Sequence, residues 1–155
     1  MRKGILEAAT DGGCRGNPGL GGWAFVVKLG TEFKGKQGSS QLTTNNEMEL
    51  KALVELLKWS EQVSTIAKLV VYIDSAYVIN GVTKWMLGWQ DRGWKTASGT
   101  PVKNLELWKE LSRLTGRTEL ELVFEKVKGH SGHPMNEAAD ARCNISMDEL
   151  ELSNL

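Results

Sequence analysis

The sequence lacks most of the features that would set it apart from an ordinary globular protein. Its 155 residues include only two cysteines, Cys14 and Cys143, which are too few for a disulfide framework. No apolar stretch resembles a signal peptide or could span a bilayer. Basic and acidic residues number 19 each, so no overall field draws the chain towards a membrane or nucleic acid. We therefore expect a cytoplasmic protein with no membrane partner, in which any basic surface is local.

Common nucleotide-binding motifs are missing as well. The glycines of residues 12–22 never satisfy G-x-G-x-x-G, and no G-K-[ST] occurs, so neither a dinucleotide site nor a P-loop is supported. Histidine is scarce. An H-x-x-H pair of His130 and His133, completed by Cys143, has irregular spacing for zinc and is a weak alternative.

The length and the hydrophobic content of 41% are sufficient for a single core. We expect one domain over residues 1–146 and an acidic, frayed tail at 147–155. Strands are predicted at 5–10, 23–28, 31–38, 68–73 and 120–127, and helices from 44 onward and at 75–81, 100–115 and 135–143. Segments 12–22 and 85–100 are predicted to form turns. The resulting order, β-β-β-α-β-α-α-β-α, indicates an α/β fold with helices on both faces of a mixed sheet.

Four carboxylates stand where chain geometry could bring them together. Asp11 and Asp74 each close a predicted strand, and open α/β sheets bind ligands in the crevice outside their strand ends. A turn role for Asp11 and a helix cap for Asp74 explain these two residues equally well. Asp140 is surrounded by alanines that would let its helix approach closely, although a solvated helix face is the plainer explanation.

Glu49 is more informative because of its place in the helical pattern. It lies four residues before Leu53 and seven before Leu56, on the apolar stripe of its helix. A buried carboxylate without a partner costs several kcal/mol, so Glu49 needs a cation. Oxygen ligands suit Mg²⁺ or Mn²⁺ better than zinc. Two such ions about 4 Å apart would activate water and stabilise the leaving oxygen in phosphodiester cleavage. Neighbouring Glu47 is explained by a capping box with Thr44 and is left out of the site.

Tryptophans and basic residues gather in one stretch of the chain. Trp85, Trp89, Trp94 and Trp108 are accompanied by Lys84, Arg92, Lys95 and Lys103. Aromatic rings beside phosphate-binding cations are typical of a nucleic-acid grip. Core packing is an equally good explanation for Trp108, which has helical spacing with Leu105 and Leu111.

Five segments carry recognisable motifs. They are TDGGCRGNPG (10–19), TTNNEMEL (43–50), YIDSAYV (72–78), WMLGWQDRGWKTASGTPVKNLELW (85–108) and VKGHSGHPMNEAAD (127–140). Together, and in this order, they resemble bacterial type 1 ribonuclease H over nearly the whole chain. Any one motif would be weak, whereas five in sequence are highly specific.

The resemblance implies a fold, an activity and a site. The implied fold is a five-stranded mixed sheet, three antiparallel strands followed by two parallel ones, with helices on both sides. The implied activity is endonucleolytic hydrolysis of the RNA strand of RNA–DNA hybrids, leaving a 3′-hydroxyl and a 5′-phosphate. The implied catalytic residues are Asp11, Glu49, Asp74 and Asp140, which hold two Mg²⁺ or Mn²⁺ ions with substrate bound, and His130, a loop histidine that assists turnover. The expected partner is the hybrid alone, bound by a monomer with no obligate protein partner.

The same resemblance implies a set of substrate contacts. The resemblance implies that the hybrid's minor groove or its phosphates are contacted by Cys14, Asn17, Thr44, Asn45 and Asn46. The 2′-hydroxyls in the minor groove distinguish RNA from DNA. Contacts to the DNA strand fall to Trp85 and Trp108, and phosphate contacts in the basic stretch to Arg92, Lys95 and Lys103.

Some positions depart from the family pattern. Where lysines often cluster, this chain has Gln90, Asp91, Ser98, Gly99 and Thr100. We therefore expect weaker hybrid affinity with intact chemistry. Ala76 replaces a residue that is often polar, which weakens the case for one base-edge contact, and Met135 stands where an acid is frequent.

Two rival functions stay open from the sequence. A catalytically silent hybrid-binding module is disfavoured because binding alone does not require a buried Glu49. A nuclease core of a related fold, such as a resolvase or transposase, would act on DNA instead.

Overall fold

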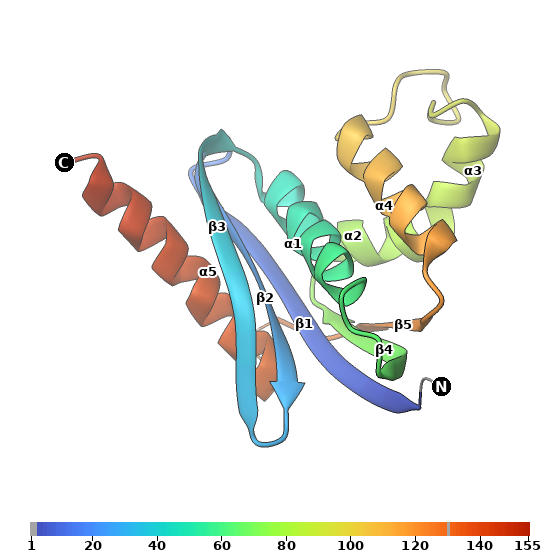
Figure 1. Cartoon of the computed structure of the whole chain (residues 1–155). Helices are drawn as coiled ribbons and strands as arrows, with labels where there is room; N and C mark the ends of the chain where they lie inside the picture. The colour runs from blue at the N-terminus through green and yellow to red at the C-terminus, as the bar shows by residue number, and fades with distance from the viewer. Residues whose placement is uncertain (1–2, 130) are drawn as a thin grey trace.

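The computed structural model describes residues 3–129 and 131–155 as one five-stranded sheet with helices on both sides (Figure 1). The strand order is β3-β2-β1-β4-β5. Strands β1 (Gly4–Arg15), β2 (Gly19–Leu29) and β3 (Glu32–Thr43) are antiparallel, whereas β4 (Ile66–Ile73) and β5 (Glu121–Lys126) run parallel to β1. The α/β fold predicted from the sequence is confirmed.

The helices form two layers of unequal thickness. One face of the sheet is covered by α1 (Asn45–Ser60), and α4 (Leu105–Arg117) packs on α1 from outside. The other face is covered by α5 (Pro134–Ser153), as Figure 1 shows. Between β4 and α4 the chain forms α2 (Ala76–Asn80), a π-helical turn (Gly81–Trp85) and α3 (Met86–Asp91). The main core lies between the sheet and the α1 layer, and a smaller one lies beneath α5.

The glycine-rich segment 12–22 is mostly strand, so the predicted turn there is wrong in extent. β1 continues to Arg15 and β2 resumes at Gly19. The glycines serve close packing instead. A Cβ on Gly12 would lie 2.6 Å from the carbonyl oxygen of Met48 in α1, and a Cβ on Gly22 would lie 3.0 Å from the carbonyl oxygen of Cys143 in α5. Missing side chains at these two positions let both helix layers approach the sheet directly.

The start of α1 shows the threonine half of the predicted capping box. Thr44 is the N-cap, and its Oγ1 accepts a hydrogen bond of 3.2 Å from the amide of Glu47. An N-cap of this kind stabilises a helix by about 1 kcal/mol. It also fixes where the helix begins, and therefore which residues of α1 face the sheet.

Segment 85–100, predicted to be turn-prone, contains α3, and the helix predicted from Pro101 begins later. Pro101 instead bridges to Lys95 in an extended pair, and the amide of Val102 donates to the carbonyl oxygen of Trp94. Val102 is buried, and Asn104 adopts a left-handed conformation with φ of 58° just before α4. Burial of Val102 holds the segment as a loop, which overrides the local preference of a threonine-proline pair for a helix start.

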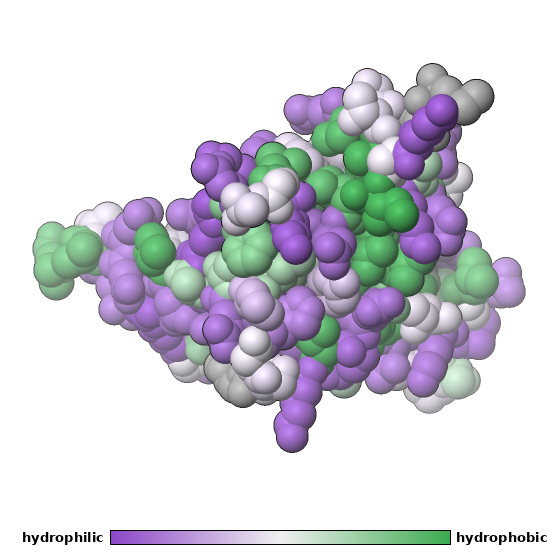
Figure 2. Space-filling view, turned by 90° about the horizontal axis from the view of Figure 1, so that it is seen from below, coloured by the Kyte–Doolittle hydropathy of each residue, from purple (hydrophilic) through white to green (hydrophobic). Residues whose placement is uncertain are grey.

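The predicted end of the last helix is wrong. We expected it to stop near Cys143 and the chain to fray from Met147, whereas α5 runs to Ser153. Met147 is buried, and Asn154 exchanges two side-chain hydrogen bonds with Gln41 of β3, of 2.8 and 3.0 Å. Along α5, which extends to the left in both views, hydrophilic side chains dominate and apolar ones gather at its free end (Figure 2). None of the helices in the described ranges is long and apolar enough to cross a membrane.

Candidate active site

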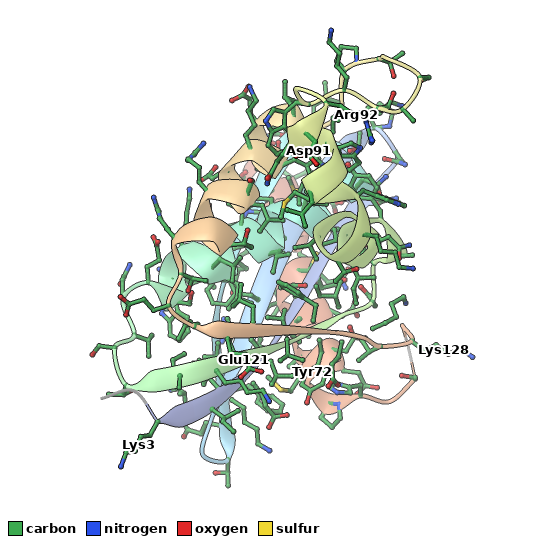
Figure 3. The ribbon with its side chains drawn as sticks, turned by 90° about the vertical axis from the view of Figure 1, so that its right-hand side faces the viewer. Lys3, Tyr72, Asp91, Arg92, Glu121 and Lys128 are labelled. Atoms are coloured by element: carbon green, nitrogen blue, oxygen red, sulfur yellow. The ribbon has the colours of Figure 1, made fainter. Side chains whose placement is uncertain are left out.

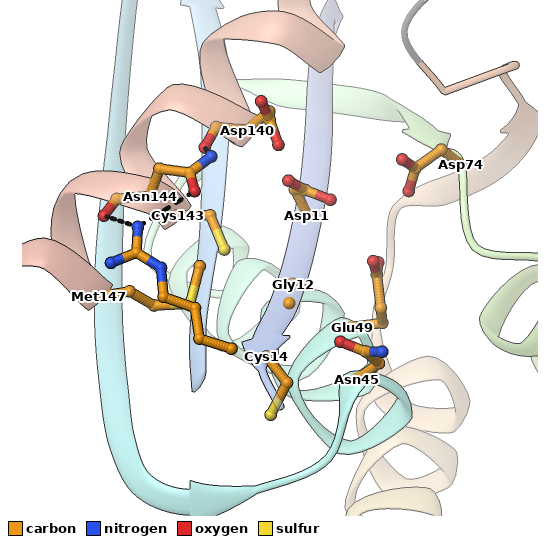
Figure 4. A pocket seen from close by; sticks show the side chains of 12 residues that line it. Asp11, Gly12, Cys14, Asn45, Glu49, Asp74, Asp140, Cys143, Asn144 and Met147 are labelled. Atoms are coloured by element: carbon orange, nitrogen blue, oxygen red, sulfur yellow. Dashed lines mark hydrogen bonds between the residues drawn. The ribbon is translucent and has the colours of Figure 1, made fainter. Parts of the chain in front are cut away.

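Three carboxylates converge beside the two adjacent strands β1 and β4, at the C-terminal end of β4. Asp11 extends from β1 opposite Ala24 of β2, Glu49 from the first turns of α1, and Asp74 from the residue after β4. One carboxylate oxygen from each lies within 4.8 Å of the others (Figure 4). The parallel pairing of β1 with β4, which aligns Thr10 with Ile73, brings Asp11 and Asp74 side by side. The predicted convergence of these three residues is thus found in the structure.

Glu49 reaches the other two carboxylates through a close contact between helix and strand. A Cβ on Gly12 would overlap the amide nitrogen of Glu49, so α1 can lie this close only against a glycine. The apolar stripe of the helix, with Leu53 and Leu56 fully buried, turns Glu49 inward as its spacing predicted. Its Oε2 is buried and has no hydrogen-bond partner among the described residues.

Asp140 approaches from the opposite layer. It belongs to α5 and lines the same hollow of about 330 Å³ as the other three carboxylates (Figure 4). The side chain of Asp140 is close enough to Asp11 to help raise the pKa of that carboxyl. It is not part of the tight three-residue group, so the fourth predicted ligand stands beside the cluster, and neighbouring Ala139 is buried where α5 meets the sheet.

The electrostatics of this cluster are unfavourable without a counter-charge. Burial, followed by the neighbouring charge of Asp74 and the hydrogen bond with Asp140, raises the pKa of Asp11 to about 8. Burial, followed by the charges of Asp11 and Asp74, raises the pKa of Glu49 well above its ordinary value. Asp11 and Glu49 both resist ionisation because water is largely excluded and their neighbours are like-charged.

The same features fit a divalent cation. The donors are carboxylate oxygens, the ligand type that Mg²⁺ and Mn²⁺ prefer. The buried Oε2 of Glu49 lacks a protein partner in the described residues, and a cation would supply one. The three clustered carboxylates therefore form a site suited to a divalent metal ion.

A second hollow beside the cluster gathers most of the predicted minor-groove and phosphate residues. It is lined by Asn17, Thr44, Asn45, Asn46, Lys103 and Asn104. The side-chain oxygen of Asn17 accepts a hydrogen bond of 3.1 Å from the amide of Asn45, which joins the turn after β1 to the start of α1. Cys14 lies in the carboxylate hollow, where its thiol donates to the carbonyl oxygens of Gly19 and Thr43.

The tryptophans divide into buried and exposed rings. Trp108 is completely buried, and its Nε1 donates a 2.9 Å hydrogen bond to the hydroxyl of Tyr77. The predicted contact between Trp108 and the DNA strand is therefore wrong, because the ring packs in the core beneath Trp89 and against Gly81. Trp85 is 41% exposed, and its ring centre lies 5.9 Å from that of Trp89 with the two planes tilted by 46°, so Trp85 is available to a ligand.

The basic residues predicted to contact phosphates are all exposed. Arg92 follows α3 (Figure 3), and its Nε donates to the carbonyl oxygen of Lys95 in the same loop. Lys103 reaches the hollow beside the carboxylates from the far end of this loop. Arg92, Lys95 and Lys103 thus keep their predicted availability to a polyanion.

The structure describes only one of the two histidines, His133. His130 lies outside the described residues. His133 is the N-cap of α5, where its Nδ1 accepts a hydrogen bond of 3.3 Å from the amide of Asn136, and its ring lies 4.6 Å from that of Tyr72. His133 is therefore a packing and capping residue. Cys143 is buried and donates to the carbonyl oxygen of Gly22, which leaves the zinc alternative without support.

Sequence reasoning missed three residues of this region. Gly12 had only been counted in a turn, and Asn104 had no signal beyond a helix start that proved to be misplaced. Arg15 was not singled out at all, yet it lines the carboxylate hollow. Met135 stands where the family often has an acidic residue, and no reason for this difference could be read from the sequence. In the structure Met135 is buried in the small core with Ala139.

Known proteins match both the sequence and the fold. The RNase H family model matches residues 4–145. The Ribonuclease H of Alcanivorax borkumensis is 47% identical over 142 residues, covering 92% of this chain and 91% of the relative. That of Halorhodospira halophila is 43% identical over 149 residues, covering 96% and 97%.

A solved structure agrees as well. LC9-RNase H1, a type 1 RNase H with the type 2 active-site motif, superimposes with a TM-score of 0.83 at 28% identity, covering 96% of this chain and 74% of that one. The predicted enzyme class is confirmed together with the fold. Five motifs, the sheet order, the converging carboxylates and the close relatives agree, and the chain belongs to the ribonuclease H family.

Proposed function

We propose that Asp11, Glu49, Asp74 and Asp140 hold divalent metal at the centre of an endonuclease that hydrolyses the RNA strand of RNA–DNA hybrids. The observation that carries this proposal is the approach of three carboxylates within 4.8 Å of one another, one of them with a buried oxygen lacking a partner in the described part of the chain. Like charges at this distance are stable together only with a cation or a shared proton.

The four residues divide the work by their places in the fold. Asp11 and Asp74 come from the sheet, which gives them fixed positions. Glu49 closes the site from α1, and Asp140 approaches from α5, whose exposed face leaves it accessible to substrate. Two Mg²⁺ ions, or Mn²⁺ in their place, supply when bound the activation of water and the neutralisation of the leaving 3′-oxygen. We assign His130 the assisting role in turnover, by its resemblance alone.

Hybrid binding falls to the hollow beside the carboxylates and to the exposed basic loop. Side-chain amides of Asn17, Asn45 and Asn46 offer donors and acceptors suited to 2′-hydroxyls, and Asn104 adds a further amide at the same hollow. Trp85 provides an exposed ring for the DNA strand. Cys14 lines the edge of the site, and Arg92, Lys95 and Lys103 neutralise phosphates.

Cleavage of a labelled RNA–DNA hybrid tests the proposal directly. We expect cleavage with Mg²⁺ and with Mn²⁺, 3′-hydroxyl and 5′-phosphate products, and none with a chelator. Duplex DNA assayed in parallel should stay intact, and its cleavage would instead favour a resolvase-like or transposase-like core. Activity that survives chelation would end the metal proposal.

A matched pair of variants then separates catalysis from binding. E49Q should lose cleavage and keep hybrid binding, whereas E47Q, two residues away on the same helix, should keep both. D11N should behave as E49Q does. If E49Q cleaves as well as E47Q does, the chain hydrolyses hybrids without the Glu49 carboxylate, and the proposed site is wrong.

The physical state of the protein forms part of the same proposal. We infer a monomer that needs no protein partner, because the assigned site is built entirely from one chain. Light scattering after size-exclusion chromatography tests this, and a concentration-dependent dimer would contradict it. The cytoplasmic setting is inferred from the scarcity of cysteines alone.

A further inference from the structure

Arg15 is a cation at the edge of a strongly acidic hollow. It is the last residue of β1, and it lines the hollow together with the four carboxylates. Among the described residues that line this hollow, Arg15 is the only one with a basic side chain. A substrate strand must bring phosphates here, and a guanidinium matches a phosphate in both charge and hydrogen-bond geometry.

The guanidinium is held by the last turns of α5. Its Nη2 lies 2.8 Å from Oδ1 of Asp148, and its Nη1 lies 3.0 Å from Oε1 of Glu151. Nη2 also donates, at 3.4 Å, to the main-chain and side-chain oxygens of Asn144, which lies on the α5 side of the hollow (Figure 4). One positive charge is thus shared by two negative ones, so the group as a whole repels a phosphate.

The two carboxylates belong to a part of the chain beyond the family match. That match ends at residue 145, whereas Arg15 lies within it. The acidic turn with Asp148 and Glu151 extends α5 past this limit, and buried Met147 anchors the extension to the sheet. The interaction therefore joins a residue beside the site to a segment that the matched family region does not include.

We propose that Arg15 is a phosphate contact for the hybrid, and that Asp148 and Glu151 weaken this contact by holding its guanidinium against α5. The inference rests on the proposed hybrid-cleaving function. It adds Arg15 as a substrate contact and the C-terminal extension of α5 as a segment that weakens substrate binding. The side chains of Asp148 and Glu151 are 60% and 50% exposed. Exposed ion pairs are weak and exchange readily, so a phosphate competes with them for the guanidinium and binding is reduced without being blocked.

Hybrid binding by charge-neutralised variants tests this. Anisotropy of a labelled RNA–DNA hybrid, titrated in chelator so that it stays intact, gives Kd over a range of KCl concentrations. D148N/E151Q should bind about three- to ten-fold more tightly at low salt, the range that exposed ion pairs support. Its plot of log Kd against log salt should steepen by about 0.9, as for one additional phosphate contact. With Mg²⁺, KM should fall while kcat is retained.

The control variants isolate Arg15 from general electrostatics. E149Q removes one charge from the same turn of α5 without removing a partner of Arg15, so it should change Kd much less than E151Q. In an R15Q background, D148N/E151Q should lose its advantage. An equal gain in E149Q and E151Q, or a full gain without Arg15, overturns the inference, as does weaker binding by D148N/E151Q.

Two measurements distinguish a failure of the inference from an unfolding of α5 in the variant. Far-UV circular dichroism of D148N/E151Q should match the parent. If α5 instead frays in this variant, NMR of the unaltered protein replaces the binding test. The Nε–H signal of Arg15 is assigned by its loss in R15Q, and the absence of a shift in this signal on adding hybrid overturns the inference. A parent that cleaves hybrid while every variant binds alike leaves the proposed function intact, whereas a parent that neither binds nor cleaves removes both.

Discussion

The backbone of Gly12 lies directly against the amide of Glu49, so the strand that carries one carboxylate and the helix that carries another touch without an intervening side chain. This contact sets the depth at which Glu49 enters the cluster. It also couples the stability of the fold to the geometry of the site, because any side chain at Gly12 must push α1 away.

Replacing Gly12 by alanine should therefore damage both stability and activity. Overpacking of this kind costs about 1–3 kcal/mol, and here the obstructing atoms are backbone, which yields least. Urea unfolding should show the loss, and cleavage should fall further than stability alone explains. G116A is the matched control, because its Cβ meets nothing within 4 Å and alanine favours a helix. Unchanged stability of G12A would contradict the contact.

Neutralising Glu49 should improve stability while removing function. The carboxylate is buried beside like charges, and its pKa is raised well above the ordinary value chiefly by burial. E49Q should thus raise the unfolding free energy of the metal-free protein by about 0.5–2 kcal/mol, the range typical of relieving a strained site. Thermal unfolding in chelator measures this, with E47Q as the reference. A destabilised E49Q would mean that its charge is already compensated by protein groups.

The metal-free protein should lose stability as the pH rises from about 4 to about 8. Burial raises the pKa of Asp11 to about 8, so the folded state holds a proton that the unfolded state releases near 3.8. The stabilising contribution is complete below the lower value and is lost as the pH passes through the upper one. Melting temperatures in chelator should fall across this window, and saturating Mg²⁺ should flatten the trend. A rise in stability over the same range would contradict the shift.

The two tryptophans assigned to the DNA strand should separate cleanly. W108A removes a fully buried ring and its hydrogen bond to Tyr77, which should cost about 3–5 kcal/mol of stability. W85A removes a ring that is 41% exposed, so it should leave stability nearly intact and weaken hybrid binding by about 1–3 kcal/mol. Denaturant unfolding and anisotropy of a labelled hybrid measure the two effects. Equal loss of stability in both variants would place Trp85 in the core.

Lysines introduced into the exposed loop before α4 should strengthen hybrid binding. Ser98 and Thr100 are exposed, and the S98K/T100K variant adds two charges close to Lys95 and Lys103. Hybrid affinity should rise, and the dependence of log Kd on log salt should steepen by up to about 0.9 per added phosphate contact. Cleavage at saturating hybrid should stay the same. If affinity does not respond, this loop does not contact the substrate.

The sequence predicted the convergence of Asp11, Glu49 and Asp74 better than it predicted the loops around them. Asp74 follows from the end of a strand and Glu49 from its position on an apolar helical stripe, because each depends on a local pattern. Asp11 was singled out as a strand end, although β1 continues past it to Arg15. Asp140 was predicted as a site residue mainly from the family resemblance, since a charged residue among alanines is ambiguous by itself. Capping by Thr44 was likewise readable from four consecutive residues.

The errors share a physical cause, which is dependence on distant partners. The start of α4 was misplaced because burial of Val102 overrides a local helix signal. Arg15 was missed because its hydrogen-bonding partner Asn144 lies 129 residues away. The extent of α5 depends on Met147 finding a place against the sheet, and no periodicity within a short acidic tail reveals that contact.

The four carboxylates belong to both sides of the molecule, with Glu49 on the layer over one face and Asp140 on the layer over the other. A cation bound between them would link the two helix layers across the C-terminal end of β4. Separation of α5 from the sheet and loss of the ion would then be one event, so amide hydrogens of α1 and α5 would become protected together when metal is added. The same ions that serve the chemistry would in this way govern how often the protein opens.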